Sequence, residues 1–339
     1  MNQQQETDQL FAGVDLGGTS IKVALADCLG NRMLTRAIPT HSHRGAIDVV
    51  QRIGTLIGDL LNQSGKAPEQ LHGIGVGAPG LVDVHEGVTK FLPNFPTHWR
   101  DVPVTAMLQE HFQVPVRLLN DVRSATLGEL RFGHGCNHPR LTMAFFSIGT
   151  GIGGGLALQG KLWLGPLGAA GELGHQTIIP DGPRCGCGNR GCLEAIASGT
   201  AIAAEGVRLM RCGLAPSLHE SIDGNADRVT VREMTAHADQ DPPLKEALIE
   251  AAKSIGIAAA NVVTILHPDM IVLGGGVAEM GPLLTDTVRQ VIRERVGMMP
   301  TDNVRVERSL LGEHAGLQGA IALAMGPVEL SGPIVEGTH

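Results

Sequence analysis

Apolar and polar residues follow one another in regular blocks along most of the chain, and these blocks predict alternating strands and helices. Short apolar runs that end in glycine or a charged residue are typical of buried strands, whereas apolar residues three or four positions apart are typical of helices. Strands are predicted at 10–18, 19–27, 31–39, 71–80, 114–121, 269–277 and 303–312, with two more within 141–165. Helices are predicted at 46–65, 103–112, 122–133, 242–268, 281–296 and 315–326.

A strand, a glycine-rich turn and a second strand occur twice, about 135 residues apart, each time followed by helix and strand in alternation. This repeat predicts an α/β fold with two related domains around a central cleft. We expect a disordered leader at 1–10, a small N-terminal α/β domain at 11–133 and a large C-terminal α/β domain at 134–314. The last helix, 315–327, is expected to pack back on the N-terminal domain, ahead of a tail at 328–339.

The composition limits the classes of function that fit this chain. Its 339 residues exceed what one ordinary hydrophobic core holds, which agrees with two domains. The net charge of −8 and an aromatic content of 3%, with no tyrosine, argue against nucleic acid or an anionic membrane as a partner. The polar N-terminus does not have the form of a signal peptide, and no run of about 18 apolar residues predicts a membrane span. We therefore expect a cytoplasmic protein with reduced thiols.

The two glycine-rich turns, at 15–20 and 149–155, are candidate phosphate-binding sites. Consecutive N–H groups of such a turn can converge on one anion, and the hydroxyl of Thr19 or Thr150 would add a donor. The alternative is a plain hairpin whose glycines adopt positive φ. Neither turn has the Gly-Lys-Ser/Thr ending of a P-loop, and each precedes a strand, whereas the dinucleotide fingerprint precedes a helix.

Two further features belong to the same hypothesis. Asp15 ends an apolar strand just before the first turn, where its carboxylate could hold Mg²⁺ through water or could cap the turn with an Asx-type hydrogen bond. Gly274–Gly276 end a buried strand, where a close backbone approach suits a flat ring such as adenine. Packing of a helix on the sheet is the alternative for these three glycines.

Asn120 and Asp121 lie at the end of another apolar strand and head a predicted helix. Asp121 is a candidate general base, which would take the proton from a substrate hydroxyl as that oxygen attacks a γ-phosphoryl group. A helix N-cap is the structural alternative, because aspartate is favoured at that position.

Three of the six cysteines fall within eight residues, in the pattern His175-x9-Cys185-x-Cys187-x4-Cys192. Three thiolates and one imidazole suit a closed, structural zinc site. A disulfide or free thiols are the alternatives, although the cluster holds an odd number of cysteines and neighbouring Cys-x-Cys thiols pair poorly.

A metal in the loop 175–192 would fix Glu172 and Glu194, which lie on either side of the cluster. Fixed carboxylates are good acceptors for the hydroxyls of a sugar. A solvated surface pair is the alternative for these two glutamates. Cys28, Cys136 and Cys212 are scattered along the chain and are expected to be small buried hydrophobic residues.

Taken together, the segments "GVDLGGTSIKVALAD", "GVGAPG", "LNDVRSATLGE", "SIGTGIGGGLALQGKL", "GELGH", "CGCGNRGCLE" and "HPDMIVLGGG" resemble the ROK family over about 11–325. That family joins bacterial sugar kinases and sugar-responsive repressors. The resemblance implies an actin-like, hexokinase-type fold, with two RNase H-like α/β domains around a central cleft. It also implies ATP as the phosphoryl donor, together with Mg²⁺ and a structural Zn²⁺.

The resemblance further implies roles for individual residues. Asp121 would be the catalytic base, and the sugar would contact Pro79, Gly80, Asn94, Asn120, Asp121, Glu172, His175 and Glu194. The nucleotide and its Mg²⁺ would contact Asp15, Gly17, Gly18, Thr19, Lys22, Gly149, Thr150, Gly151 and Gly153, with adenosine near Gly275 and Gly276. Zinc would be held by His175, Cys185, Cys187 and Cys192.

One position departs from the family pattern. The family often has Asn-Asp-Ala-Asn around the base, whereas this chain has Asn120-Asp121-Val122-Arg123. Arg123 would either alter the sugar pocket or point to solvent.

The leading hypothesis is therefore an ATP-dependent hexose kinase that phosphorylates glucose at O6, a glucokinase. A kinase for N-acetylmannosamine or N-acetylglucosamine is the alternative within the same class. A non-enzymatic, sugar-responsive repressor that lacks its DNA-binding domain is the alternative of another class, and the roughly ten residues before the first predicted strand, which hold no recognition helix, argue against it. Small sugar kinases of this kind are usually dimers, so a homodimer is expected.

Overall fold

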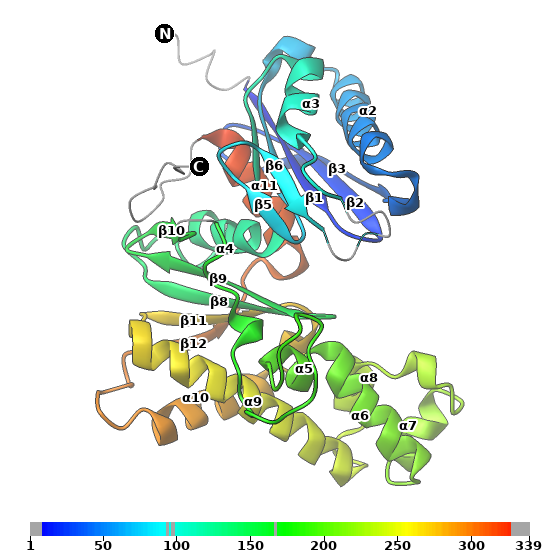
Figure 1. The fold of residues 1–339 in the computed structure, drawn as a ribbon, viewed down its shortest axis with the longest axis vertical. Coiled ribbons are helices and arrows are strands. Elements are labelled where there is room, and N and C mark those ends of the chain that lie inside the picture. Colours follow the sequence, from blue (N-terminus) through cyan, green and yellow to red (C-terminus); the bar gives the residue numbers. More distant parts are fainter. Residues whose placement is uncertain (1–8, 93–94, 96–98, 166–167, 327–339) are drawn as a thin grey trace. The chain divides into compact units, whose positions relative to one another are not determined.

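The computed structural model of the protein describes residues 9–92, 95, 99–165 and 168–326, and these fall into two compact units (Figure 1). Unit 1 takes the described residues up to Arg140, then Leu156–Ala170, and those from His314 onwards. Unit 2 takes Leu141–Gly155 and Gly171–Glu313. The chain thus returns to unit 1 twice before it ends.

Unit 1 is built on a five-stranded sheet with the order β3-β2-β1-β4-β7. Strand β1 is antiparallel to β2 and parallel to β4, which is in turn parallel to β7. The strands are β1 (Leu10–Leu16), β2 (Ser20–Ala26), β3 (Arg32–Pro39), β4 (Leu71–Ala78) and β7 (Val116–Asn120), and a small hairpin pairs β5 (Leu81–Asp83) with β6 (Val88–Phe91). Because β1, β4 and β7 are parallel, their carboxyl ends meet at one edge of the sheet.

Helices α2 (Ala46–Ser64) and α11 (Ala315–Met325) cover opposite faces of this sheet. Val23 of β2 belongs to the apolar core that includes α2, whereas the next residue, Ala24, packs against Ile321 of α11. Successive side chains of a strand point to opposite faces, so a sheet covered on both sides needs apolar residues at both sets of positions. That requirement explains the uninterrupted apolar runs of the sequence.

Helix α11 approaches its neighbours so closely that glycine is required beneath it. A Cβ on Gly75 of β4 would lie 2.0 Å from the carbonyl oxygen of Ala320, and one on Gly319 would lie 1.6 Å from the carbonyl oxygen of Ser124. Helix α4 (Asp121–Arg131) and the sheet are thereby packed tightly around α11, which Figure 1 shows in red. Helix α3 (Val104–Phe112) completes the helices of unit 1.

In unit 2, β11 (Met270–Gly274) lies between β8 (Met143–Ile148) and β12 (Arg305–Arg308) and is parallel to both. A glycine turn joins β8 to β9 (Ile152–Leu158), and the last residues of β9 belong to unit 1, where they pair with β10 (Lys161–Trp163). The helices are α5 (Leu193–Ala197), α6 (Gly199–Arg211), α7 (Pro216–Ser221), α8 (Val231–His237), α9 (Pro242–Leu266) and α10 (Pro282–Arg295). Short 3₁₀ helices occur at Ser42–Arg44, Pro68–Gln70, Leu173–His175, Ala226–Arg228, Gly276–Met280 and Gly312–His314.

Helix α9 corrects one expectation from composition. It is long and apolar enough to cross a membrane, with a mean hydropathy of 1.5 over its best window, although the sequence was expected to hold no such segment. The helix packs against α10, α6, α5 and α8 within unit 2, and its buried residues include Leu248, Ile255 and Val263. These contacts are those of a central core helix in a globular domain.

Candidate active site

The carboxyl edge of the parallel strands in unit 1 brings two carboxylates together. Asp15 of β1 lies in register with Gly77 of β4, and Asp121 follows directly after the last residue of β7. Gly77 leaves room for the start of α4, because a Cβ there would lie 3.2 Å from the side chain of Ser124 and 3.6 Å from the Cα of Asp121. The two aspartates are close enough for the charge of Asp15 to raise the pKa of Asp121.

Asp121 is the first residue of α4 and not its cap, which corrects the structural alternative weighed for it. The N-cap is Asn120, whose Oδ1 accepts hydrogen bonds from the backbone N–H groups of Val122 and Arg123, at 3.0 and 3.2 Å. Asp121 Oδ1 accepts a hydrogen bond from Val122 at 2.9 Å. Burial raises the pKa of Asp121 to about 6, and this bond and the charge of Arg123 oppose the rise. Such a carboxylate is ionised at neutral pH and can still accept a proton, as a general base must.

Asp15 lies on the α11 face of the sheet, with its carboxylate about 3.5 Å from where a Cβ of Gly316 would be. Burial raises the pKa of Asp15, and the charge of Lys22, its partner in the β1–β2 register, opposes the rise. Within the described residues its carboxylate accepts no hydrogen bond, so the Asx-type cap considered from the sequence is not formed. Two neighbouring carboxylates, both held in a partly buried site, suit a hard divalent cation such as Mg²⁺.

In both glycine turns, carbonyl groups accept hydrogen bonds from the protein, whereas the two central N–H groups have no acceptor among the described residues. In the first turn, Thr40 binds the carbonyl oxygens of Gly17 and Thr19, through its Oγ1 at 2.6 Å and its N–H at 2.9 Å. Gly17 N–H itself donates to the carbonyl of Ser20 at 2.9 Å. Among the described residues, the N–H groups of Gly18 and Thr19 meet no protein acceptor. These two N–H groups are therefore available as donors to a bound anion.

The second turn, in unit 2, repeats this arrangement with different partners. The carbonyl oxygen of Gly149 accepts from Gly199 N–H at 2.8 Å, that of Thr150 accepts from the Thr200 hydroxyl, and that of Gly151 accepts from Gly149 N–H at 2.9 Å. No acceptor in the described part of the chain pairs with the N–H groups of Thr150 and Gly151. Thr40 and Thr200 were not among the residues predicted from the sequence, since both lie far from their turns along the chain.

The glycines of these turns are not explained by backbone conformation, contrary to the plain-hairpin alternative. Gly17, Gly149 and Gly151 all have φ values outside the left-handed region. A Cβ on Gly149 or on Gly276 would meet no atom within 4 Å, whereas Gly275 has φ of 80° and is pressed against the carbonyl of Ile148. The space beside Gly149 and Gly276 is therefore required neither by the backbone conformation nor by packing. Such space would let a ligand approach the backbone closely.

Glu194 connects the cysteine loop to the second turn. Its Oε2 accepts a hydrogen bond from the N–H of the buried Ile152 at 2.9 Å, and its Oε1 lies 3.7 Å from the Cys185 sulfur. A Cβ on Gly151 would lie 2.4 Å from the same Oε2. Glu172, by contrast, is half exposed and lies 4.0 Å from Nε2 of His175. The two glutamates are therefore neither a solvated surface pair nor equivalent to each other.

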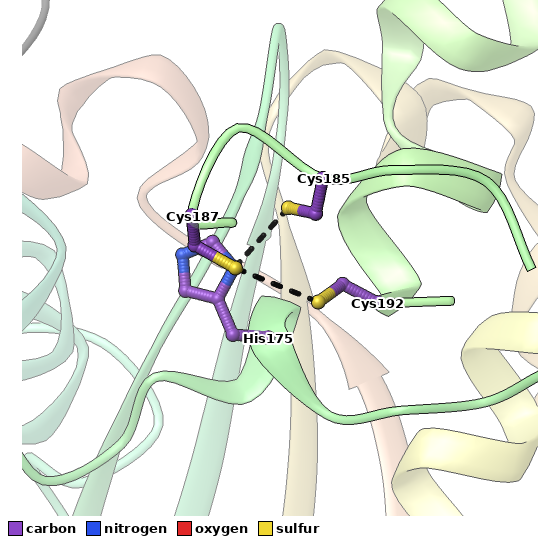
Figure 2. A group of neighbouring side chains, drawn as sticks. All are labelled: His175, Cys185, Cys187 and Cys192. Atoms are coloured by element: carbon purple, nitrogen blue, oxygen red, sulfur yellow. Dashed lines mark hydrogen bonds between the residues drawn. The ribbon is translucent and has the colours of Figure 1, made fainter. Parts of the chain in front are cut away.

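The cysteine loop gathers four metal-binding side chains, and Figure 2 shows them pointing toward one another. The ligand atoms of His175, Cys185, Cys187 and Cys192 all lie within 4.8 Å of one another. The sulfurs of Cys187 and Cys192 are 3.7 Å apart, and Cys185 Sγ is 3.7 Å from His175 Nδ1. Metal–sulfur bonds of about 2.3 Å in a tetrahedron separate two sulfurs by roughly 3.8 Å. All three cysteines are free thiols, so the disulfide alternative does not apply, and the donor set fits zinc.

Several predicted residues are placed otherwise than expected. Arg123 is almost fully buried and donates to main-chain carbonyls, so it does not point to solvent. Cys136 and Cys212 are exposed and Cys28 is only half-buried, so none of them is the buried hydrophobic residue that was expected. Asn94 lies outside the described residues.

Asn120 has fewer free groups than a dedicated sugar contact would offer. Besides its capping bonds, its Oδ1 accepts from Arg123 Nη1 at 3.1 Å, and its Nδ2 donates to the carbonyl of Gly80 at 3.0 Å. One Nδ2 hydrogen remains for a ligand. Gly80, next to Pro79, has φ of 76°, a conformation that favours glycine.

A family model described as "ROK family" matches residues 11–326. The chain belongs to the ROK family. A glucokinase from Halalkalibacterium halodurans is 32% identical over 318 residues, which cover 92% of this chain and 94% of that protein. A xylose repressor from Caldicellulosiruptor bescii is 30% identical over 314 residues, covering 92% of this chain and 77% of that protein.

A crystal structure of a ROK family glucokinase from Streptomyces griseus, in complex with glucose and AMPPNP, matches with a TM-score of 0.79 and 32% identity. The match covers 93% of this chain and 99% of that one. The predicted hexokinase-type α/β fold and the membership of the ROK family are therefore confirmed. In this ROK protein, Asp15, Asp121 and the first turn lie in unit 1, and the second turn and the cysteine loop lie in unit 2.

Proposed function

We propose that this ROK protein is an ATP-dependent hexose kinase that transfers the γ-phosphoryl group of ATP to O6 of glucose. The observation that carries the proposal lies within unit 1. There, a carboxylate with a pKa of about 6, Asp121, lies beside Asp15, and Asp15 leads directly into a turn with unpaired N–H groups. A base for a hydroxyl and a cradle for phosphate are the two parts that phosphoryl transfer to an alcohol needs.

Asp121 is the group that we assign to the proton transfer. In its ionised form it accepts the proton of the sugar hydroxyl as the oxygen attacks phosphorus, and it releases that proton to solvent after ADP has formed. The unpaired N–H groups of the two turns hold the phosphate oxygens, and because they are fixed by the protein beforehand they need no reorganisation during the reaction. Lys22, next to Asp15 in the register, adds positive charge near the first turn.

Two metal ions belong to this proposal. Asp15 would hold Mg²⁺ through water, and the ion would neutralise charge on the phosphates. His175, Cys185, Cys187 and Cys192 would hold a structural zinc ion that keeps the loop from Glu172 to Glu194 in shape.

The remaining ligand contacts follow the ROK motifs. We assign the sugar to Pro79, Gly80, Asn94, Asn120, Asp121, Glu172, His175 and Glu194. We assign the nucleotide to Asp15, Gly17, Gly18, Thr19, Lys22, Gly149, Thr150, Gly151 and Gly153, with the adenosine against Gly275 and Gly276. The free Nδ2 hydrogen of Asn120, the half-exposed carboxylate of Glu172 and the Nε2 of His175 support the sugar assignment. The open space beside Gly149 and Gly276 supports the nucleotide assignment.

The likeness to a xylose repressor favours a second candidate, a protein that binds a sugar without turning it over. A kinase for N-acetylmannosamine or N-acetylglucosamine is a third. We further propose a cytoplasmic homodimer with domains at 11–133 and 134–314 and the helix 315–327 on the first of them. Light scattering on the purified protein tests the dimer.

A coupled assay of ADP release with Mg·ATP and a panel of sugars separates these candidates. Glucose is expected to give the highest kcat/KM, and NMR is expected to identify the product as glucose 6-phosphate. Turnover restricted to N-acetylated sugars would select the third candidate. Sugar binding by calorimetry without any ADP release would select the second.

A further inference from the structure

Arg123 is the largest fully buried side chain in the described part of the protein, and the proposed chemistry gives it no role. A guanidinium does not lose its proton in proteins, so its burial is tolerated only where hydrogen-bond acceptors surround it. Its position also departs from the family pattern. The partners of this side chain therefore indicate what it does.

The guanidinium joins two parts of unit 1 that are distant in sequence. Nε and Nη2 donate to the carbonyl oxygen of Ala170 at 3.2 and 3.0 Å, and Nη2 also donates to that of Ala169 at 3.2 Å. Nη1 donates to Oδ1 of Asn120 at 3.1 Å. The planar fork of arginine can serve these acceptors at once, which a lysine ammonium cannot.

Apart from Arg123, the hydrogen bonds that hold this segment among the described residues are local ones, such as that from Gly168 N–H to the carbonyl of Gly165 at 3.3 Å. Gly168 and Gly171 flank the two alanines with φ values of 71° and 90°, and glycine loses more conformational freedom on folding than any other residue. Ala170 N–H donates to the carbonyl of Leu164 at 2.8 Å. The chain runs on from this segment into Glu172 and His175, which we assign to the sugar.

The other end of the clamp acts on Asn120. Because Arg123 donates to Oδ1, that atom must be the amide oxygen, and the Nδ2 amine is thereby directed to the carbonyl of Gly80. The remaining Nδ2 hydrogen is therefore held in one orientation. A single guanidinium thus fixes one proposed sugar contact and the segment that leads into two others.

We propose that Arg123 is a positioning residue for the sugar acceptor, which clamps Ala169–Ala170 to Asn120 and so presets the sugar contacts on both sides of the clamp. The choice of a sugar as the ligand rests on the proposed function, whereas the clamp between Ala169–Ala170 and Asn120 does not. It predicts that loss of the fork weakens binding of the sugar and leaves binding of the nucleotide unchanged.

The test compares Arg123→Met, Arg123→Lys and Arg123→Ala with the wild type. Calorimetry with glucose, and separately with Mg·AMPPNP, gives the two dissociation constants, and hydrogen exchange followed by mass spectrometry reports on peptides that cover 164–175. Arg117→Met is the matched control, because Arg117 also donates to main-chain carbonyls of unit 1, those of Leu323 and Ala324. Circular dichroism and zinc content report folding.

For Arg123→Met we expect the Kd for glucose to rise roughly 10- to 100-fold. A change of this size corresponds to the loss of one or two charge-assisted hydrogen bonds. The Kd for AMPPNP should stay within about twofold, exchange in 168–172 should be faster, and Arg117→Met should change none of these. Added guanidinium at millimolar concentration should restore part of the glucose affinity of Arg123→Ala. If Arg123→Met does not fold, Arg123→Lys carries the test, with an intermediate loss expected for glucose.

Unchanged exchange in 168–172, or equal losses for sugar and nucleotide, would overturn the clamp. Failure of the proposed function looks different. In that case the wild type releases no ADP with any sugar, while the exchange of 168–172 still responds to the variants.

Discussion

The hydrogen bond from Ile152 N–H to Glu194 connects the cysteine loop to the second glycine turn, which we propose as the phosphate site of unit 2. Glu194 follows Cys192 by two residues and accepts a hydrogen bond from the N–H of Ile152, the first residue of β9. Replacing Glu194 with alanine removes this acceptor and keeps the helix α5 around it, since alanine is the best helix former. We predict that Glu194→Ala weakens nucleotide binding in the absence of any sugar.

The size of the effect follows from the burial of the donor. Ile152 is 2% exposed, so its N–H is not readily hydrated when Glu194 is shortened. An unsatisfied buried donor costs about 1–3 kcal/mol. If nucleotide binding requires the ordered turn, this cost appears in the Kd for Mg·AMPPNP as a loss of roughly 5- to 150-fold. Glu194→Gln retains an acceptor and should lose less.

A substitution at Gly151 also disturbs the hydrogen bond between Glu194 and Ile152, from the side of the turn. Alanine at Gly151 is compatible with the backbone, but its Cβ would lie 2.4 Å from Glu194 Oε2 and would displace the carboxylate. Gly151→Ala should therefore weaken nucleotide binding in the wild type and have much less effect in Glu194→Ala. A double-mutant cycle measures this coupling, expected to be about 1 kcal/mol or more.

Calorimetry with Mg·AMPPNP on the four proteins of the cycle is the assay. Glu172→Ala is the control, because the carboxylate of Glu172 lies 4.0 Å from Nε2 of His175, whereas that of Glu194 binds the N–H of Ile152. Its Kd for AMPPNP should stay within about twofold. Additive effects of Gly151→Ala and Glu194→Ala, or an AMPPNP affinity unchanged in Glu194→Ala, would refute the link between loop and turn.

Four further outcomes are expected. Asp121→Asn should lower kcat by about 10²- to 10⁴-fold. The same variant should raise the free energy of unfolding at pH 7 by roughly 1–3 kcal/mol, because burial raises the pKa of Asp121 from 3.8 to about 6 and disfavours its ionised form. Urea denaturation measures this change, and Asp302→Asn, at an exposed position, is the control. This gain should be fully present above pH 6 and vanish as the pH falls below 4, because both states are then protonated. For the wild type, kcat/KM should fall about tenfold per unit below pH 6, as the base becomes protonated. Cys187→Ser should lose bound zinc in elemental analysis together with affinity for the sugar, whereas Cys212→Ser should keep both; wild-type protein without zinc would contradict the assignment.

The strands and the glycine turns could be predicted because their signal is local. The parallel strands of unit 1 are short and largely apolar, and the structure has a strand at every predicted position. Four helices between 193 and 237, α5 to α8, were not predicted. Three of them have five to seven residues, too few for a helical period to stand out against a polar background.

The cap of α4 shows where local rules stop. Asparagine and aspartate are both favoured as caps, so Asn120-Asp121 is ambiguous by one residue, and the structure decides for Asn120. Arg123 could not be placed at all, because its burial depends on Ala169 and Ala170, 46 and 47 residues further along. From sequence alone, a charged residue two positions from a candidate base is expected to be exposed. Here the carbonyl groups of a distant segment bind Arg123 and allow it to be buried.

The glycine turns could be located from their own sequences, but the partners that bind their carbonyl groups could not. Each turn has glycines that need no positive φ, and in each turn a threonine hydroxyl from a later segment binds one carbonyl group, that of Gly17 for Thr40 and that of Thr150 for Thr200. A free turn would bond its own N–H groups to its own carbonyls or to water. In both turns an outside donor takes a carbonyl group, and the two central N–H groups meet no acceptor in the described part of the protein. The capacity to bind an anion thus comes from segments that contain no glycine motif, and the same solution occurs in both units although the bracing threonines stand at unrelated distances from their turns.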